Sequence, residues 1–152
     1  MNTHFVEIRK ATLADLENIQ SCAYLAYSKY VDRMKKEPAP MNADYAAQIE
    51  NGAVDVAVVE HKFAGYVVFY PDGDHFHLES VAVVPEQSRR GIGRALIDYV
   101  ERTARSAGVN AVELYTNEVM IENIAMYQKM GYKEIARKRQ AEFNRVFFRK
   151  TW

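Results

Sequence analysis

The stretch SVAVVPEQSRRGIGRALIDYV, residues Ser80–Val100, carries the most information about how this chain folds. Its first part alternates apolar and other residues like a strand and stops before Pro85, whereas its second part repeats apolar residues every three to four positions like a helix. A strand therefore leads through a turn with Gly91 and Gly93 into a helix. The first amides of a helix have no partner within it, and the helix dipole adds positive potential. Because glycine lets a ligand approach the backbone closely, this turn is a candidate cradle for a pyrophosphate.

Two other phosphate-binding motifs fit this turn poorly. A dinucleotide-binding redox domain is disfavoured, because Leu96 stands where a third glycine is expected and an antiparallel hairpin comes before this strand. A Walker A loop is absent, since no Gly-Lys-Ser/Thr follows. A pair of glycines alone is a weak indication of phosphate binding, so the alternative that they only form a tight turn stays open.

The rest of the chain supplies further strands and helices around this unit. The expected elements, in chain order, are a strand 5–9, a helix from the N-cap Thr12 to a loop at Pro38 and Pro40, a helix 42–51, strands 54–60, 63–70 and 75–83, a helix from Ile92 to Gly108, a strand 111–116, a helix 121–130, and strands 132–139 and 145–151 around a turn with Asn144. On the helix from Ile92, the pairs Asp98–Arg102 and Glu101–Arg105 are expected on the face opposite the apolar one.

This order of elements predicts an α/β fold. The hairpins are antiparallel, whereas the strand–helix–strand unit 75–116 requires a right-handed crossover and a parallel pair. We expect a mixed, mostly antiparallel sheet with a central parallel strand pair flanked by helices, in a single domain over residues 1–152.

Composition narrows the class of protein. The 152 residues contain 20 basic and 20 acidic side chains, which gives no electrostatic reason to expect a nucleic-acid or anionic-membrane partner. The single cysteine, Cys22, excludes an internal disulfide and a thiolate zinc site. No apolar run reaches the length of a membrane span, and no signal sequence is evident, so we expect a cytoplasmic protein.

Two segments resemble the GNAT superfamily of N-acetyltransferases. LESVAVVPEQSRRGIG, residues 78–93, is similar to the family's strand and Q/R-x-x-G-x-G/A turn, with Ser88 at the Gln/Arg position. IAMYQKMGYKE, residues 124–134, is similar to its short helix with Tyr followed by Gly-Tyr; Met120 stands where many members have Asn, and Asn123 where Ala is usual. The resemblance covers nearly the whole chain. It implies a GNAT-like fold, acetyl-CoA as co-substrate, and a cofactor site formed by Val81, Ala82, Val83, Ser88, Arg89, Arg90, Gly91, Ile92, Gly93, Arg94 and Asn123.

The resemblance also implies roles in the chemistry. The backbone of Val81 and Val83 would pair with the pantetheine arm, and Tyr127 would protonate the departing thiolate. His77 and Glu79 occupy strand positions where members place a proton acceptor, and which of them, or water, is the base stays open. His75 shares their face of the strand, but a His-x-His metal site lacks a third ligand, so no metal is expected.

The sequence leaves the acceptor open. In the resembled fold, the helix with Tyr24, Tyr27 and Met34 borders the acceptor side, so these residues are candidate contacts for a primary amine of a small molecule or a peptide. The predicted function is acetyl transfer to such an amine by direct attack in a ternary complex. An acyl-CoA-binding sensor or regulatory module without transfer activity is the alternative, and the final strands offer an exposed edge for a homodimer.

Overall fold

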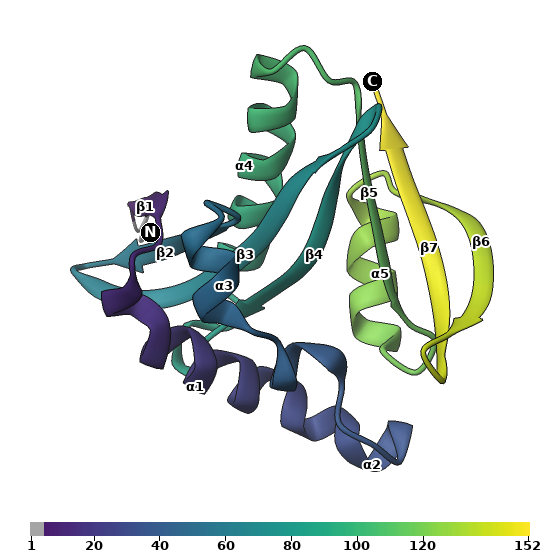
Figure 1. The fold of residues 1–152 in the computed structure, drawn as a ribbon, viewed down its shortest axis with the longest axis horizontal. Helices are drawn as coiled ribbons and strands as arrows, with labels where there is room; N and C mark the ends of the chain where they lie inside the picture. Colours follow the sequence, from purple (N-terminus) through teal and green to yellow (C-terminus); the bar gives the residue numbers. More distant parts are fainter. Residues whose placement is uncertain (1–4) are drawn as a thin grey trace. The chain divides into compact units, whose positions relative to one another are not determined.

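A computed structural model describes residues 5–152 and groups the chain into two compact units. Among the described residues, unit 1 comprises residues 5–69 and Ser80–Tyr99, and unit 2 comprises Tyr70–Glu79 and Val100–Trp152. The chain crosses between the units within three elements, which are β3 (Lys62–Asp72), β4 (His75–Val83) and α4 (Ile92–Ser106) (Figure 1).

Unit 1 contains an antiparallel set of strands. β1 (Val6–Lys10) pairs with β2 (Val54–Val59), and β2 pairs with β3. The hairpin between β2 and β3 turns on two residues with positive φ, Glu60 (52°) and His61 (66°), which explains how so short a connection reverses the chain. β2 is buried along nearly its whole length, and the buried residues include its one acidic side chain, Asp55.

The helices of unit 1 are shorter than their sequence pattern indicated. α1 (Leu16–Tyr27) follows a 3₁₀ turn whose N-terminal Thr12 donates its amide to the Asp15 carboxylate (2.8 Å). It gives way to a 3₁₀ turn at Ser28–Tyr30 and to α2 (Val31–Met34), which ends because Lys35 takes a left-handed conformation with φ of 61°. The helical region therefore stops before Pro38, the residue expected to end it. α3 (Tyr45–Glu50) starts at the N-cap Asp44, later than expected.

Unit 2 contains the strands and the helix that follow α4. β5 (Ala111–Asn117) pairs in parallel with β4 over Phe76–Leu78 and antiparallel with β7 (Phe143–Thr151). β6 (Lys133–Gln140) pairs with β7, and α5 (Ile121–Lys129) lies beside β5 and β7 (Figure 1). The ring of Tyr127 on α5 packs 6.3 Å from the ring of Phe148 on β7.

Strand pairing follows the order β1-β2-β3-β4-β5-β7-β6, with β4–β5 the one parallel pair among the recorded ladders of the described strands. This confirms the predicted mixed sheet with a central parallel pair flanked by helices. No helix within residues 5–152 is long and apolar enough to span a membrane.

Three details of the sequence interpretation were wrong. Glu101 is 3% exposed rather than on a solvent face with Arg105, because it accepts hydrogen bonds from Tyr132 (2.9 Å) and Lys150 (2.9 Å). Arg105 instead lies 4.3 Å above the ring of Trp152. The last hairpin turns at residues 141 and 142, both with positive φ, so Asn144 belongs to β7.

Candidate active site

The glycine turn joins β4 to α4 within unit 1. Gly91 has φ of 78° and Arg89 has φ of 64°, two left-handed conformations close together that reverse the chain into the helix. The Ser88 hydroxyl donates to the carbonyl of Pro85 (2.8 Å), which holds the start of the turn. The Gly91 carbonyl accepts from the Ala95 amide (2.9 Å), so the helical ladder begins here and the preceding amides lie outside it.

The space around the two glycines suits a phosphate-bearing ligand. A Cβ added to Gly91 would meet no atom within 4 Å, and one added to Gly93 would meet only the Val83 side chain at 3.7 Å. Both residues therefore border open space at the start of a 15-residue helix. Arg89, Arg90 and Arg94 are exposed beside them and add positive charge. The residues present fit a pyrophosphate group.

The end of β4 that leads into this turn is held from both sides. The Tyr27 hydroxyl donates to the Val81 carbonyl (2.9 Å), and the Val84 amide donates to the Ala64 carbonyl (2.9 Å). A Cβ on Gly65 would lie 2.5 Å from the Ala82 carbonyl oxygen, so only glycine allows this close approach of β3 and β4. The recorded pairing of β4 with β5 stops at Leu78.

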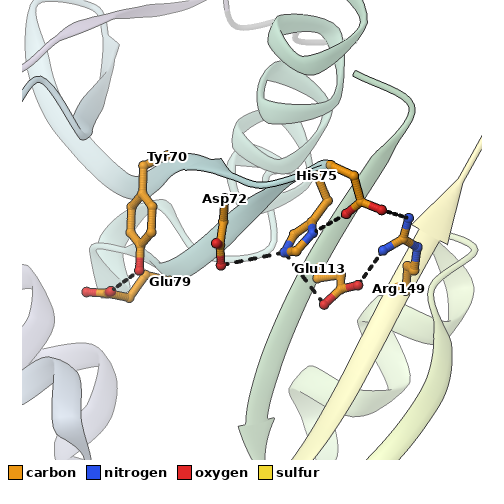
Figure 2. Close-up of polar contacts among 7 residues, drawn as sticks. Tyr70, Asp72, His75, Glu79, Glu113 and Arg149 are labelled. Atoms are coloured by element: carbon orange, nitrogen blue, oxygen red, sulfur yellow. Dashed lines mark hydrogen bonds and ion pairs between the residues drawn. The ribbon is translucent and has the colours of Figure 1, made fainter. Parts of the chain in front are cut away.

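His77 and Glu79 lie in unit 2 on the half-exposed face of β4, as the alternation of the strand predicted. The Glu79 carboxylate accepts a hydrogen bond from the Tyr70 hydroxyl (2.9 Å; Figure 2). The ring of His77 lies between Tyr70 (5.4 Å between centroids) and Tyr115 (5.5 Å). Burial lowers the pKa of His77, so its imidazole is neutral at neutral pH and can accept a proton. Burial and the Glu79 carboxylate raise the pKa of Tyr70, which keeps its hydroxyl a donor.

His75, two residues before His77 on β4, belongs to a separate polar cluster. Its ring contacts the carboxylates of Asp74 (2.9 Å), Asp72 (3.7 Å) and Glu113 (3.7 Å), and Arg149 pairs with Glu113 and Asp74 (Figure 2). Within residues 5–152, no group of three His, Cys, Asp or Glu side chains is arranged to hold a metal ion.

Tyr127 and Asn123 lie one turn apart on α5 in unit 2. Tyr127 is 5% exposed, and its ring packs 6.0 Å from the ring of Tyr132. The Asn123 amide donates to the sulfur of Met120 (3.8 Å), which also accepts from the Thr116 hydroxyl (3.3 Å). The methionine sulfur thus takes the polar contacts at this end of the helix.

The three candidate acceptor contacts differ in their surroundings. Tyr24 is 61% exposed, and Met34 is half-buried. Tyr27 is buried, packs 6.4 Å from Tyr30, and uses its hydroxyl on Val81. Within unit 1, this hydrogen bond therefore connects Tyr27, a predicted contact of the amine substrate, to Val81, a predicted contact of the cofactor.

The structure adds Tyr70 and Tyr115 to the candidates. Both lie within ring-contact distance of His77, and Tyr70 also binds Glu79. The strand alternation of AVELYTN could have placed Tyr115 on the same face as Glu113. The rings next to His77 come from two other strands, β3 and β5, which the pattern of β4 alone does not identify. Pairing across strands is information that one strand's pattern does not contain.

Comparison with known proteins gives the family. The model of the acetyltransferase (GNAT) family matches residues 13–132. An N-alpha-acetyltransferase from Sulfurisphaera tokodaii is 29% identical over 139 residues, covering 84% of this chain and 80% of that protein. N-acetyltransferase 8 from Homo sapiens is 34% identical over 85 residues, and the match spans only 37% of its length and 52% of this chain.

Solved structures share the fold. The PaiA N-acetyltransferase from Thermoplasma acidophilum, solved in complex with coenzyme A, superposes with a TM-score of 0.81 at 17% identity, covering 97% of this chain and 99% of that one. Arabidopsis thaliana Naa50, in complex with the bisubstrate analogue CoA-Ac-MVNAL, gives 0.74 at 13% identity, with 97% and 99% covered. These structures show the fold alone, whereas the family match over residues 13–132 shows that the chain belongs to the acetyltransferase (GNAT) family and is an acyltransferase.

Proposed function

We propose that this chain transfers the acetyl group by direct attack of a primary amine on acetyl-CoA in a ternary complex, with the residues assigned below. The observation that carries the proposal is the open glycine turn at the start of α4, directly after the β4 residues that match the family pattern. Acetyl-CoA supplies the thioester that the amine attacks.

The proposed cofactor contacts lie within unit 1. The amides of Gly91, Ile92, Gly93 and Arg94 bind the pyrophosphate together with the positive end of the helix dipole. Ser88 shapes the turn, and Arg89, Arg90 and Arg94 contribute charge. The backbone of Val81, Ala82 and Val83, beyond the recorded pairing with β5, binds the pantetheine arm, and Tyr27 fixes Val81 in place. For Asn123 in unit 2, a cofactor contact stays a prediction.

The base is His77 or Glu79, acting directly or through water. The neutral imidazole of His77 is ready to accept a proton, since burial lowers its pKa. Glu79 is oriented by the Tyr70 hydroxyl at 2.9 Å, so Tyr70 is a positioning residue for this carboxylate. Either group removes the proton that the amine loses as its nitrogen forms the bond to the acetyl carbon.

Tyr127 acts as the acid that protonates the departing sulfur. Its ring packs against the rings of Tyr132 and Phe148, which hold the phenol in place. A phenol held in this way can deliver a proton without reorganising the helix. The proposed acceptor contacts in unit 1 are Tyr24, Tyr27 and Met34.

The test is release of coenzyme A thiol with a broad panel of amines, detected with a thiol reagent. The protein's single thiol does not interfere, because Cys22 is 1% exposed and burial raises its pKa to about 12. Amine-dependent thiol release, with the acetylated product identified by mass spectrometry, supports transfer. Acetyl-CoA binding by calorimetry without transfer to any amine would instead support a sensor module.

We further propose a cytoplasmic location, no nucleic-acid partner, and a homodimer formed through the free edge of β6, the last strand in the sheet order. Light scattering on the purified protein tests the dimer, and a monomer at micromolar concentration would reject it.

A further inference from the structure

One face of the unit 2 strands carries charged and aromatic side chains. Residues directly opposite each other in a ladder share a face, and the register aligns His77, Glu113, Arg149 and Lys133 in this way. The intervening residues, such as Phe148, are buried on the other face, where α5 packs. The polar face, defined here by the positions in register with Glu113, is half-exposed along β4, β5 and β7.

Charge on this polar face is separated across the strands. Carboxylates gather on β3 and β4, where Asp72 and Glu79 lie (Figure 2), and Asp74 belongs to the turn between these strands. Basic side chains occur on β6 and β7, and residues 133–152 contain seven basic and two acidic residues in a chain whose total charge is zero. The register places four of these cations on the polar face: Lys133, Lys138, Arg145 and Arg149.

A row of rings connects the two sides. Tyr70, His77, Tyr115 and Phe147 come from β3, β4, β5 and β7, and their successive centroids are 5.4, 5.5 and 5.3 Å apart. The proton acceptors proposed above lie at one end of this row. At the other end, the Lys138 ammonium lies 5.1 Å from the centre of the Phe147 ring.

Arg145 lies over the third ring of this row, that of Tyr115. Its guanidinium carbon lies 4.2 Å above the ring of Tyr115 and 5.5 Å from that of Phe143, and one nitrogen donates to the Gln140 side chain (3.3 Å). Arg149 on the same face pairs with Glu113, but no carboxylate among residues 5–152 pairs with Arg145. A guanidinium stacked on an aromatic face keeps its N–H edges available and suits bidentate contact with a carboxylate or phosphate.

From this arrangement we propose that the acceptor carries an anionic group near its reactive amine, and that Arg145 binds this group as a specificity-determining residue. The amine is then attracted to the carboxylates and His77, and the anion to the cations of β7 and β6. Amino acids with a side-chain carboxylate and peptides with acidic residues after a free N-terminus both have this chemistry. The inference rests on the proposed function, because it names the class of acceptor for the same reaction.

The experiment compares matched acceptors with the whole protein. One arm uses peptides with the same first residue and glutamate, glutamine or lysine at positions two and three, and the other uses the α-amides of glutamate, glutamine and lysine, in which the side chain carries the only anionic group. We expect kcat/KM to be about tenfold to a hundredfold higher for acidic than for neutral members of the favoured arm, the range for a charge-assisted hydrogen bond. The arm that shows the preference identifies the source of the anion.

Three variants assign the preference to this site. Arg145→Gln should remove most of the ratio between acidic and neutral acceptors, and Arg145→Lys should keep part of it, since it keeps the charge but loses the planar fork. The matched control is Arg139→Gln, which removes the same charge from β6 at a position opposite Asn144, on the other face, and should leave the ratio unchanged. Thermal melting shows that each variant is folded.

The outcomes separate this inference from the proposed function. Acetylation of amines without a preference for acidic acceptors, or an equal loss of preference in Arg139→Gln, would overturn the role of Arg145 and leave acetyl transfer standing. Weaker acetyl-CoA affinity in Arg145→Gln with unchanged acceptor preference would also overturn it. Failure to acetylate any amine, with acetyl-CoA bound, would reject the proposed function and the inference with it.

Discussion

Substituting the two glycines of the α4 turn separates backbone strain from ligand binding. Gly91→Ala places a Cβ in open space, but at φ of 78° an alanine pays the cost of a left-handed conformation, about 1–2 kcal/mol. For a chain of 152 residues this lowers Tm by roughly 2–8 °C. Gly93→Ala meets only Val83 at an ordinary 3.7 Å and gains helix propensity, so it raises stability by about 0.5–1 kcal/mol.

At position 93, two substitutions should have different effects on the affinity for acetyl-CoA. Gly93→Ala should keep its affinity, since the family pattern accepts alanine there, whereas Gly93→Glu brings a carboxylate next to the proposed pyrophosphate. Two unit charges about 4 Å apart repel by roughly 1–4 kcal/mol between bulk water and a protein surface, which predicts a loss of about fivefold to several hundredfold. Calorimetry with acetyl-CoA, beside thermal melts, measures both quantities. A folded Gly93→Glu variant with wild-type affinity would refute the assignment of the cofactor site to this turn.

Three further predictions concern the chemistry and the charges. Tyr127→Phe should lower kcat by about a hundredfold to ten-thousandfold and leave acetyl-CoA affinity nearly unchanged, because only the proton donor is lost; single-turnover transfer at wild-type speed would leave Tyr127 as packing. Arg89→Ala and Arg94→Ala should weaken acetyl-CoA binding and flatten its dependence on salt, and a wild-type affinity insensitive to salt argues against both. Burial lowers the pKa of His77 below that of the unfolded chain, so the unfolded state takes up a proton first as pH falls below about 6.5, and stability decreases. Denaturant unfolding of His77→Gln at pH 7.5 and 5.5 should show a smaller decrease than wild type, and an equal decrease would contradict this.

Local patterns in the sequence predicted most of the elements. β4 runs from His75 to Val83, the range that the alternation and Pro85 indicated, and α4 begins at Ile92 after the glycine turn. These boundaries are set by neighbours in sequence: a proline that interrupts a strand and glycines that reverse the chain. The helix expected up to Pro38 ends earlier, because Lys35 adopts a left-handed conformation. A lysine does not predict such a conformation, which glycine and asparagine favour.

What the sequence did not reveal depends on distant partners. Glu101 has the spacing of a solvent-exposed helix residue, yet it is buried because Tyr132 and Lys150 satisfy its carboxylate. Tyr70 gained a place in the candidate site only through its bond to Glu79 across the hairpin. Both cases need knowledge of which strands and helices meet, and one residue's spacing along its own element does not provide it.

The position of β7 between β5 and β6 has a consequence for how unit 2 is assembled during synthesis. The ribosome makes β5 and β6 first, but each is paired in the folded unit with β7, from Ala111 opposite Thr151 to Lys133 opposite Arg149. Until β7 emerges, both strands lack their native neighbour on that side and are available for incorrect pairing. We therefore expect the insertion of β7 to be a late step in the folding of unit 2. Its apolar residues Val146 and Phe148 should then affect how much of the newly made chain aggregates before this step.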